Sequence, residues 1–130
     1  MPLIDSSYII ALINTKDKNN KRAITLYNEI EKHDEKIIPL LMLSEAITSI
    51  SSRMGGTVSN KLYKTLIKEF EIYYPTKLDV ENAMDCVLKY DGTLSLADSL
   101  AIYIMKKNKI NNIYSFDSDF DKVKGIIRIH

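Results

Sequence analysis

The sequence predicts an α/β domain built on a short parallel sheet of four to five strands. Short apolar segments rich in β-branched and aromatic residues alternate with longer segments whose apolar residues recur at helical spacing. Such alternation is typical of βαβ units, which have right-handed crossovers and parallel sheets. The chain has 130 residues, of which 45% are hydrophobic. We therefore expect a single domain, residues 1–130, with one hydrophobic core.

The predicted strands are short and spread along the whole chain. They are Pro2–Asp5, Lys36–Pro39, Thr76–Leu78 and Ile113–Phe116, with Ile126–Ile129 as a candidate fifth. The predicted helices are Tyr8–Ile13, Ala23–His33, Leu40–Met54, Thr57–Tyr73, Asp79–Lys89 with Asp79 as its N-cap, and Ser95–Lys107. Gly55 and Gly56 separate two of these helices, which predicts a helical hairpin.

The composition excludes several classes of protein. Lys and Arg number 18 against 17 Asp and Glu, so the overall charge gives no general affinity for nucleic acid, although a local basic patch stays open. The single cysteine, Cys86, cannot form an internal disulfide, and only two histidines are present, which disfavours histidine triads and multi-histidine zinc sites. No apolar run is long enough to span a membrane and no secretory signal is evident, so we expect a cytoplasmic protein.

Four acidic residues stand where the predicted topology places ligand sites. Asp5 and Asp117 end predicted strands, and Glu45 and Asp98 lie near the starts of long helices. In open α/β sheets, ligands bind outside the carboxyl ends of the strands. Carboxylates that converge there repel one another unless a divalent cation neutralises them, and such oxygen ligands select Mg²⁺ or Mn²⁺ over zinc. These sites serve phosphoryl chemistry.

Each of these acids also has a structural interpretation. Aspartate is a preferred N-cap residue, which suits Asp5. Glu45 falls opposite the apolar stripe of its helix, so periodicity alone favours an exposed surface position. Asp98 lies at the margin of an apolar face but also completes a capping-box pattern that begins at Ser95. For Asp98 both interpretations remain open.

The acids at positions 117, 119 and 121 have the spacing that begins an EF-hand loop. That assignment fails, because the sixth position is Lys122 rather than glycine and the twelfth is Arg128 rather than glutamate. Gly55, Gly56 and Gly92 fit neither of the glycine-rich phosphate-binding patterns.

Taken together, these motifs resemble the PIN domain and, more narrowly, the VapC-type toxins of toxin–antitoxin pairs. The resemblance rests on Ile4–Ser7, Glu45, Leu96–Asp98 and Ser115–Phe120, and it covers the whole chain in order. It implies a three-layer α/β/α sandwich and a metal-dependent ribonuclease. It also implies an RNA substrate, a small antitoxin as partner and a homodimer.

The resemblance assigns roles residue by residue. Asp5, Glu45, Asp98 and Asp117 would form the acidic site that binds Mg²⁺ or Mn²⁺, directly or through water, and Glu45 would ligate or orient a water. Asp119 and Asp121 stand where some members carry a further acid. Ser6 and Ser115 would be supporting hydroxyls.

Three other functions fit parts of this pattern. A PIN domain can act in RNA processing or as a non-catalytic RNA-binding or structural subunit. A receiver-type signalling domain also gathers acids at strand ends, but it needs paired acids after the first strand, where this chain has only Asp5. In a purely structural interpretation all four acids would be caps.

Overall fold

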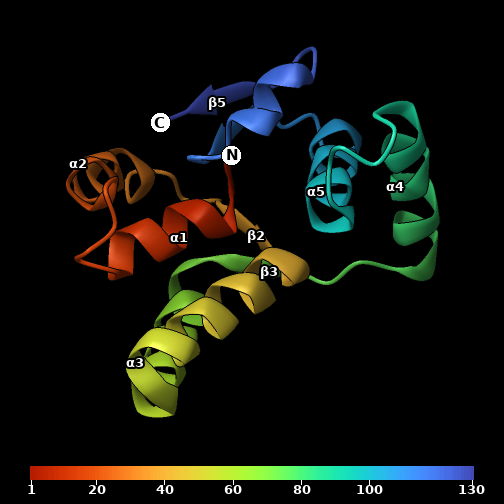
Figure 1. The fold of residues 1–130 in the computed structure, drawn as a ribbon. Helices are drawn as coiled ribbons and strands as arrows, with labels where there is room; N and C mark the ends of the chain where they lie inside the picture. Colours follow the sequence, from red (N-terminus) through yellow and green to blue (C-terminus); the bar gives the residue numbers. More distant parts are fainter.

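The computed structural model describes all residues from 1 to 130, and its centre is one sheet of parallel strands (Figure 1). The strands are β1 (Leu3–Ile4), β2 (Ile37–Pro39), β3 (Glu71–Tyr73), β4 (Asn112–Tyr114) and β5 (Ile127–Ile129), in the spatial order β3-β2-β1-β4-β5. β1 lies in the middle, where Leu3 is opposite Ile37 on one side and Ile113 on the other. The residue after β1, Asp5, therefore stands at the centre of the sheet's carboxyl edge.

Helices cover both faces of the sheet. They are α1 (Ser6–Ile13), α2 (Asn20–Ile30), α3 (Leu40–Glu69), α4 (Lys77–Lys89) and α5 (Leu96–Lys107), with a short 3₁₀ turn, η1 (Ser118–Lys122). Figure 1 shows α1, α2 and α3 on one side of the sheet and the packed pair α4 and α5 on the other. The predicted three-layer α/β/α arrangement is thus confirmed. None of the helices combines the length and the hydropathy that a membrane-spanning segment needs.

Both faces of the central strands are covered. Leu3 and Ile4 of β1 have no exposed surface, and neither does Ile113 of β4. β1 and β2 are buried and apolar at every position rather than at alternate positions, as expected for a parallel sheet between two helical layers. Tyr8 of α1 packs edge-on against Tyr114 and donates a hydrogen bond of 2.7 Å to the Ala23 carbonyl, so α1 is held against both the sheet and α2.

The long helix α3 is a hairpin of two helices. Gly55 interrupts it with φ of 85° and ψ of 174°, a conformation that residues with a Cβ rarely adopt. The chain reverses there, and the first and second halves of α3 lie beside each other at the lower left of Figure 1. The predicted hairpin at Gly55 and Gly56 is therefore present.

The third strand lies elsewhere than predicted. The prediction extended a helix to Tyr73 and placed a strand at Thr76–Leu78, whereas the helix ends at Glu69 and Glu71–Tyr73 pairs with β2. Phe70 alone separates helix from strand, and β3 is an edge strand with an exposed first residue, so its pattern is weak. The other elements were predicted correctly, with ends that differ by at most three residues.

The start of α4 also differs from the prediction. Thr76, not Asp79, is the N-cap, and the two form a reciprocal capping box in which the Asp79 carboxylate accepts from the Thr76 N–H at 3.0 Å. Asp79 is only 1% exposed. It also accepts hydrogen bonds from the Tyr73 hydroxyl at 2.9 Å and from Lys107 Nζ at 3.0 Å, which joins β3, α4 and the end of α5.

We predict that Asp79→Asn lowers the free energy of unfolding by about 2 kcal/mol at pH 7, the usual loss when a hydrogen-bonded buried charge is removed. Hydrogen bonds from Thr76 and Lys107 hold the pKa of Asp79 at about 2. A lowered pKa stabilises the fold above the unfolded value of about 4, and this stabilisation disappears as the pH falls towards 2.

Urea titrations at several pH values measure this effect. The difference between wild type and Asp79→Asn should be full at pH 6 and small at pH 2.5. Asp85→Asn, at an exposed position of the same helix, is the matched control and should change stability little at either pH. An Asp79 effect that is constant down to pH 2.5 would contradict the assignment.

Candidate active site

Four carboxylates gather at the carboxyl edge of the sheet. Asp5 follows β1 directly, Asp117 lies in the segment after β4, Glu45 is in the second turn of α3 and Asp98 is in the first turn of α5. Asp98 interacts electrostatically with each of the other three, and Asp117 also interacts with Asp5. Residues from distant parts of the sequence thus meet in one site.

Asp5 lies at the centre of this group and is only 2% exposed. Its backbone occupies the N-cap position of α1, but its side chain makes no capping hydrogen bond. The structural interpretation therefore does not account for the Asp5 carboxylate. Burial raises its pKa and the charge of Asp117 adds to this rise, whereas hydrogen bonds from Ser115 and Ser7 oppose it.

Two hydroxyls hold one oxygen of Asp5. Ser7 Oγ lies 2.5 Å and Ser115 Oγ 2.6 Å from Asp5 Oδ2. The same hydroxyls accept the N–H groups of Phe116, at 2.9 Å, and Asp117, at 3.0 Å. Each hydroxyl has one proton, so both protons go to Asp5 and neither is left for the 3.2 Å contact between the two serines. Oδ2 is saturated and fixed in place.

The other oxygen of Asp5 is much less engaged. Its partner, Ser6 Oγ, lies 3.4 Å from Oδ1 and only 2.8 Å from Glu45 Oε2. A single hydroxyl proton favours the shorter bond, so Ser6 donates mainly to Glu45. Glu45 is exposed, as its periodicity predicts, yet this bond turns its carboxylate towards the strand ends. Asp5 Oδ1 remains available for a ligand.

Asp98, like Asp79, follows a hydroxyl N-cap by three residues, but it does not complete a capping box. Ser95 caps α5 by accepting the Asp98 N–H at 3.0 Å, and only Asp79 returns a side-chain bond to complete the reciprocal box. Asp98 is half-buried. Burial, followed by the charges of Asp5 and Asp117, raises the pKa of Asp98 to about 7.

The acids after β4 differ from one another. Asp117 caps η1, since its Oδ1 accepts the Asp119 N–H at 2.9 Å, and its second oxygen makes no other hydrogen bond within the protein. Asp119 forms an ion pair of 3.0 Å with Lys122. Asp121 is exposed and binds Arg128 through both oxygens, each at 2.9 Å. Of these three, Asp117 is the one coupled to Asp5 and Asp98.

Sequence reasoning overlooked Ser7. It included this residue in the motif Ile4–Ser7 but gave it no role in the site, whereas Ser7 touches Asp5, Ser115 and the Phe116 backbone. A signal existed in the spacing: a hydroxyl two residues after an acid at a strand end can turn back and bond to that acid.

The donor set fits a hard divalent cation. All candidate ligands are carboxylate or hydroxyl oxygens, and free oxygens remain on Asp5 and Asp117. No group of three or more His, Cys, Asp or Glu side chains is arranged to ligate one ion directly. Mg²⁺ needs no such cage, because it usually keeps several waters and takes one or two carboxylates.

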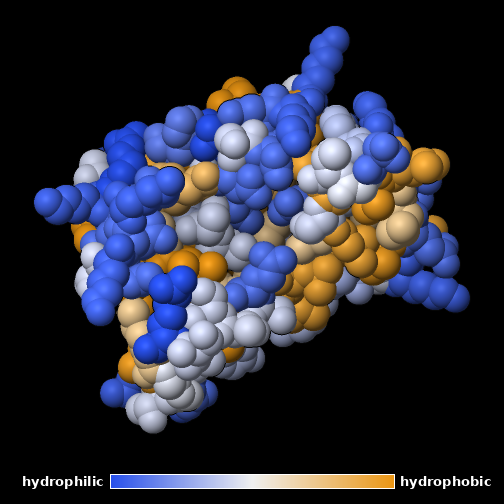
Figure 2. Space-filling view, in the orientation of Figure 1, coloured by the Kyte–Doolittle hydropathy of each residue, from blue (hydrophilic) through white to orange (hydrophobic).

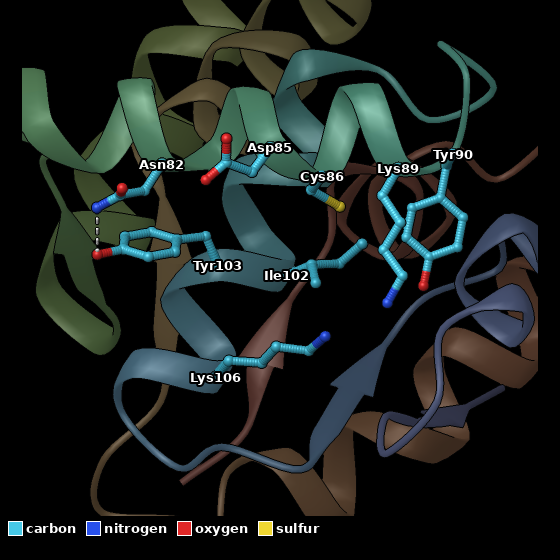
Figure 3. Close-up of a pocket in the computed structure, with 8 residues that line it drawn as sticks. All are labelled: Asn82, Asp85, Cys86, Lys89, Tyr90, Ile102, Tyr103 and Lys106. Carbon is cyan, nitrogen blue, oxygen red and sulfur yellow. Dashed lines mark hydrogen bonds between the residues drawn. The ribbon is translucent and has the colours of Figure 1, made fainter.

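The largest of the cavities lies away from this site. It has a volume of about 400 Å³ and is formed between α4 and α5, where Asn82, Cys86, Tyr90 and Tyr103 line it (Figure 3). None of the four gathered carboxylates contributes to it. Its position gives no reason to move the candidate site away from the carboxyl edge.

Solved structures share this fold. VapC20 of Mycobacterium tuberculosis, described as a sarcin–ricin loop cleaving toxin, matches with a TM-score of 0.88 and 22% identity over 99% of this chain and 98% of its own. A toxin–antitoxin complex from Klebsiella pneumoniae matches with a TM-score of 0.72 and 15% identity over 98% and 96%. VapBC2 of Rickettsia felis, bound to a DNA fragment from its promoter, matches with 0.69 and 12% over 98% and 96%.

Comparison of sequences adds the family. No curated protein matches the chain. The profile of the PIN domain, however, matches residues 3–126, a range that includes every strand end and helix start described above apart from the last strand. The chain therefore belongs to the PIN domain family.

Proposed function

We propose that this protein is a metal-dependent ribonuclease and the toxin of a toxin–antitoxin pair. The observation that carries the proposal is the buried Asp5, held by two serine hydroxyls among three further carboxylates. Membership of the PIN domain family and the fold shared with a sarcin–ricin loop cleaving toxin support RNA as the substrate. We expect the protein to act in the cytoplasm.

We assign the cation, Mg²⁺ or Mn²⁺, to Asp5, Asp98 and Asp117, with water completing its ligands and Glu45 ligating it or orienting a water. When bound, the cation would supply a water of lowered pKa and a positive charge that stabilises charge developing on the phosphate. Asp119 and Asp121 already have cationic partners in Lys122 and Arg128, so their contribution would require these ion pairs to open.

The chain's own residues position these groups. Ser7 and Ser115 fix the carboxylate of Asp5, so that Oδ1 faces the site without rearrangement. Ser6 orients Glu45 beside it. Asp98, with its pKa raised to about 7, holds a proton for much of the time at neutral pH and releases it when a cation binds nearby.

Two protein partners belong to the proposal. The fold shared with a toxin–antitoxin complex supports an antitoxin. A homodimer is supported by exposed apolar residues before and along α4 and at the start of α5, a region that is largely apolar in Figure 2. These residues are Tyr74, Leu78, Met84, Leu88 and Leu96.

The first prediction from the proposed function concerns cleavage. Purified protein should cleave RNA with Mg²⁺ or Mn²⁺ and not with EDTA, and Asp98→Asn should lower the rate by at least about 100-fold, as loss of a group that stabilises charge at a reacting centre commonly does. Gel assays on a mixed RNA pool and on a sarcin–ricin loop oligonucleotide measure this. Asp85→Asn should retain full activity. Metal-dependent cleavage by Asp98→Asn at the wild-type rate would refute the assignment, and folded protein that never cleaves would favour a non-catalytic RNA-binding subunit.

The second prediction concerns stability without metal. Because the folded pKa of Asp98 is about 7 and the unfolded value is about 4, ionised Asp98 opposes folding. The penalty is absent below pH 4, grows as the pH rises to 7 and is complete above it. Asp98→Asn should therefore be more stable than wild type at pH 8.5 in EDTA, by about 2 kcal/mol after allowance for partial exposure.

Thermal denaturation at pH 4 and pH 8.5 tests this, and the two proteins should be alike at pH 4. Adding Mg²⁺ at pH 8.5 should raise the melting temperature of wild type more than that of Asp98→Asn, because the ion binds the folded state. A wild type that is the more stable of the two in EDTA at pH 8.5 would contradict the clustering of charge.

The third prediction concerns assembly. Leu88 is 81% exposed on α4, and Leu88→Asp should convert a dimer into a monomer in light scattering, because a charge cannot be buried at an apolar interface without a partner. Ile24→Asp, at an exposed apolar position on α2, should leave the dimer intact. A monomeric wild type would exclude the homodimer. Co-purification with the product of a neighbouring small reading frame tests the antitoxin separately.

A further inference from the structure

A pocket lined mainly by polar side chains lies where α1 and α3 are in contact, at the end away from the four carboxylates. It has a volume of about 340 Å³ and is lined by Asn14, Thr15, Lys16, Arg53 and Met54. Two cationic side chains line it and no acidic one does. Neither Lys16 nor Arg53 is in an ion pair, since the ion pairs of this protein use Lys107, Lys122 and Arg128. The pocket therefore has an uncompensated positive charge.

Two rows of residues connect this pocket to the acidic site. Positions four apart lie along one side of a helix; the row on α1 is Ser6, Ile10 and Asn14, and the row on α3 is Glu45, Ser49 and Arg53. Ser6 bonds to Glu45 at one end, and Asn14 and Arg53 line the same pocket at the other. The two rows thus run side by side from the acids to the cations, over about 12 Å for eight residues of helix.

The loop that presents Lys16 is held in place. The buried Asn20 donates from Nδ2 to the carbonyls of Ala11, at 2.8 Å, and Leu12, at 3.2 Å. These carbonyls at the end of α1 would otherwise present negative charge to an anion. Asn14 is only 7% exposed, and its Oδ1 accepts the Lys16 N–H at 3.1 Å. The backbone of the loop is therefore ordered before any ligand arrives, which lowers the entropy lost on binding.

One simpler explanation accounts for part of the pocket. Arg53 lies near the end of the first half of α3, just before Gly55, and a cation is favourable at a helix C-terminus. Lys16 follows the C-terminus of α1 by three residues, so the same effect favours its charge. It does not explain why cations from two separate elements line one pocket without an acidic residue. Two cations from separate elements around one volume point to an anionic ligand.

We propose that this pocket binds a backbone phosphate of the RNA substrate, at a different nucleotide from the one cleaved. The inference rests on the proposed ribonuclease function. Arg53 suits two-pronged binding to phosphate oxygens, and Lys16 adds a point charge. The net charge of +1 gives the whole protein no general attraction for RNA, and the acidic site repels it, so local cations must supply the attraction. At about 12 Å from Glu45 along the helix, they act on a neighbouring phosphate rather than the reacting one.

Cleavage kinetics with Mg²⁺ test this on the whole protein. Lys16→Ala/Arg53→Ala should raise KM by about 10-fold, the usual effect of losing hydrogen bonds from charged groups, and leave kcat within about twofold. The slope of log(1/KM) against log[salt] should become shallower by about 0.7, the value for one phosphate of a single strand. Arg53→Lys, which keeps the charge but not the paired donors, should have an intermediate KM.

The matched control is Lys18→Ala/Lys21→Ala. This double variant removes the same charge from exposed positions in the segment that follows Lys16, outside the pocket. It should change KM by less than about threefold. Equal effects of the two double variants on KM would mean that only the total charge matters, and this would overturn the inference. An unchanged KM in the pocket variant would also overturn it. Loss of antitoxin binding with an unchanged KM would likewise overturn it, in favour of an acidic protein partner. A wild type that does not cleave RNA would instead refute the proposed function itself.

Discussion

The candidate site depends on how the protein accommodates one buried carboxylate. Asp5 is 2% exposed at the end of the central strand, where an ionised group without hydrogen bonds would be strongly destabilising. Ser7 and Ser115 supply two bonds, and both hydroxyls receive N–H groups from the segment after β4. This network joins the end of β1 to the segment that carries Asp117. The position of Asp117 therefore depends on the hydroxyl groups that donate hydrogen bonds to Asp5.

The apolar core accounts for the tolerance of the other acids. Burial, followed by the like charges at this edge, raises the pKa of Asp98, so ionised Asp98 opposes folding. The continuous apolar core beneath it, which includes Leu3, Ile4 and Ile113, provides the stability that this arrangement needs. Asp79 is also buried, but its carboxylate accepts hydrogen bonds from Thr76, Tyr73 and Lys107 and is not repelled by neighbouring acids. A carboxylate left repelled by its neighbours is typical of a functional site, and one fully satisfied is typical of a structural site.

The resemblance to the PIN domain implied the three layers. Apolar periodicity in the sequence predicted the helices and most strands, because it depends on local pattern. It missed β3, an edge strand that follows a helix after a single residue, Phe70. The sequence pattern identified Asp79 only as an N-cap and left Asp98 open between a cap and a site residue. Both follow a hydroxyl cap by three residues, and the tertiary environment distinguishes their roles. Periodicity placed Glu45 on the surface correctly but could not show that Ser6 turns it towards the strand ends.

The near-neutral composition conceals a separation of charge that only the fold reveals. Acidic side chains meet at the carboxyl edge because parallel strands deliver them there. Lys16 and Arg53 meet at the other end of the α1–α3 contact because Ser6 and Glu45 meet at that edge, and Asn14 and Arg53 each lie eight residues further along. A polyanionic strand that crosses both zones meets repulsion at one and attraction at the other. Under the proposed function, a cation bound at the acids would remove the repulsion, so metal binding and strand binding should favour each other.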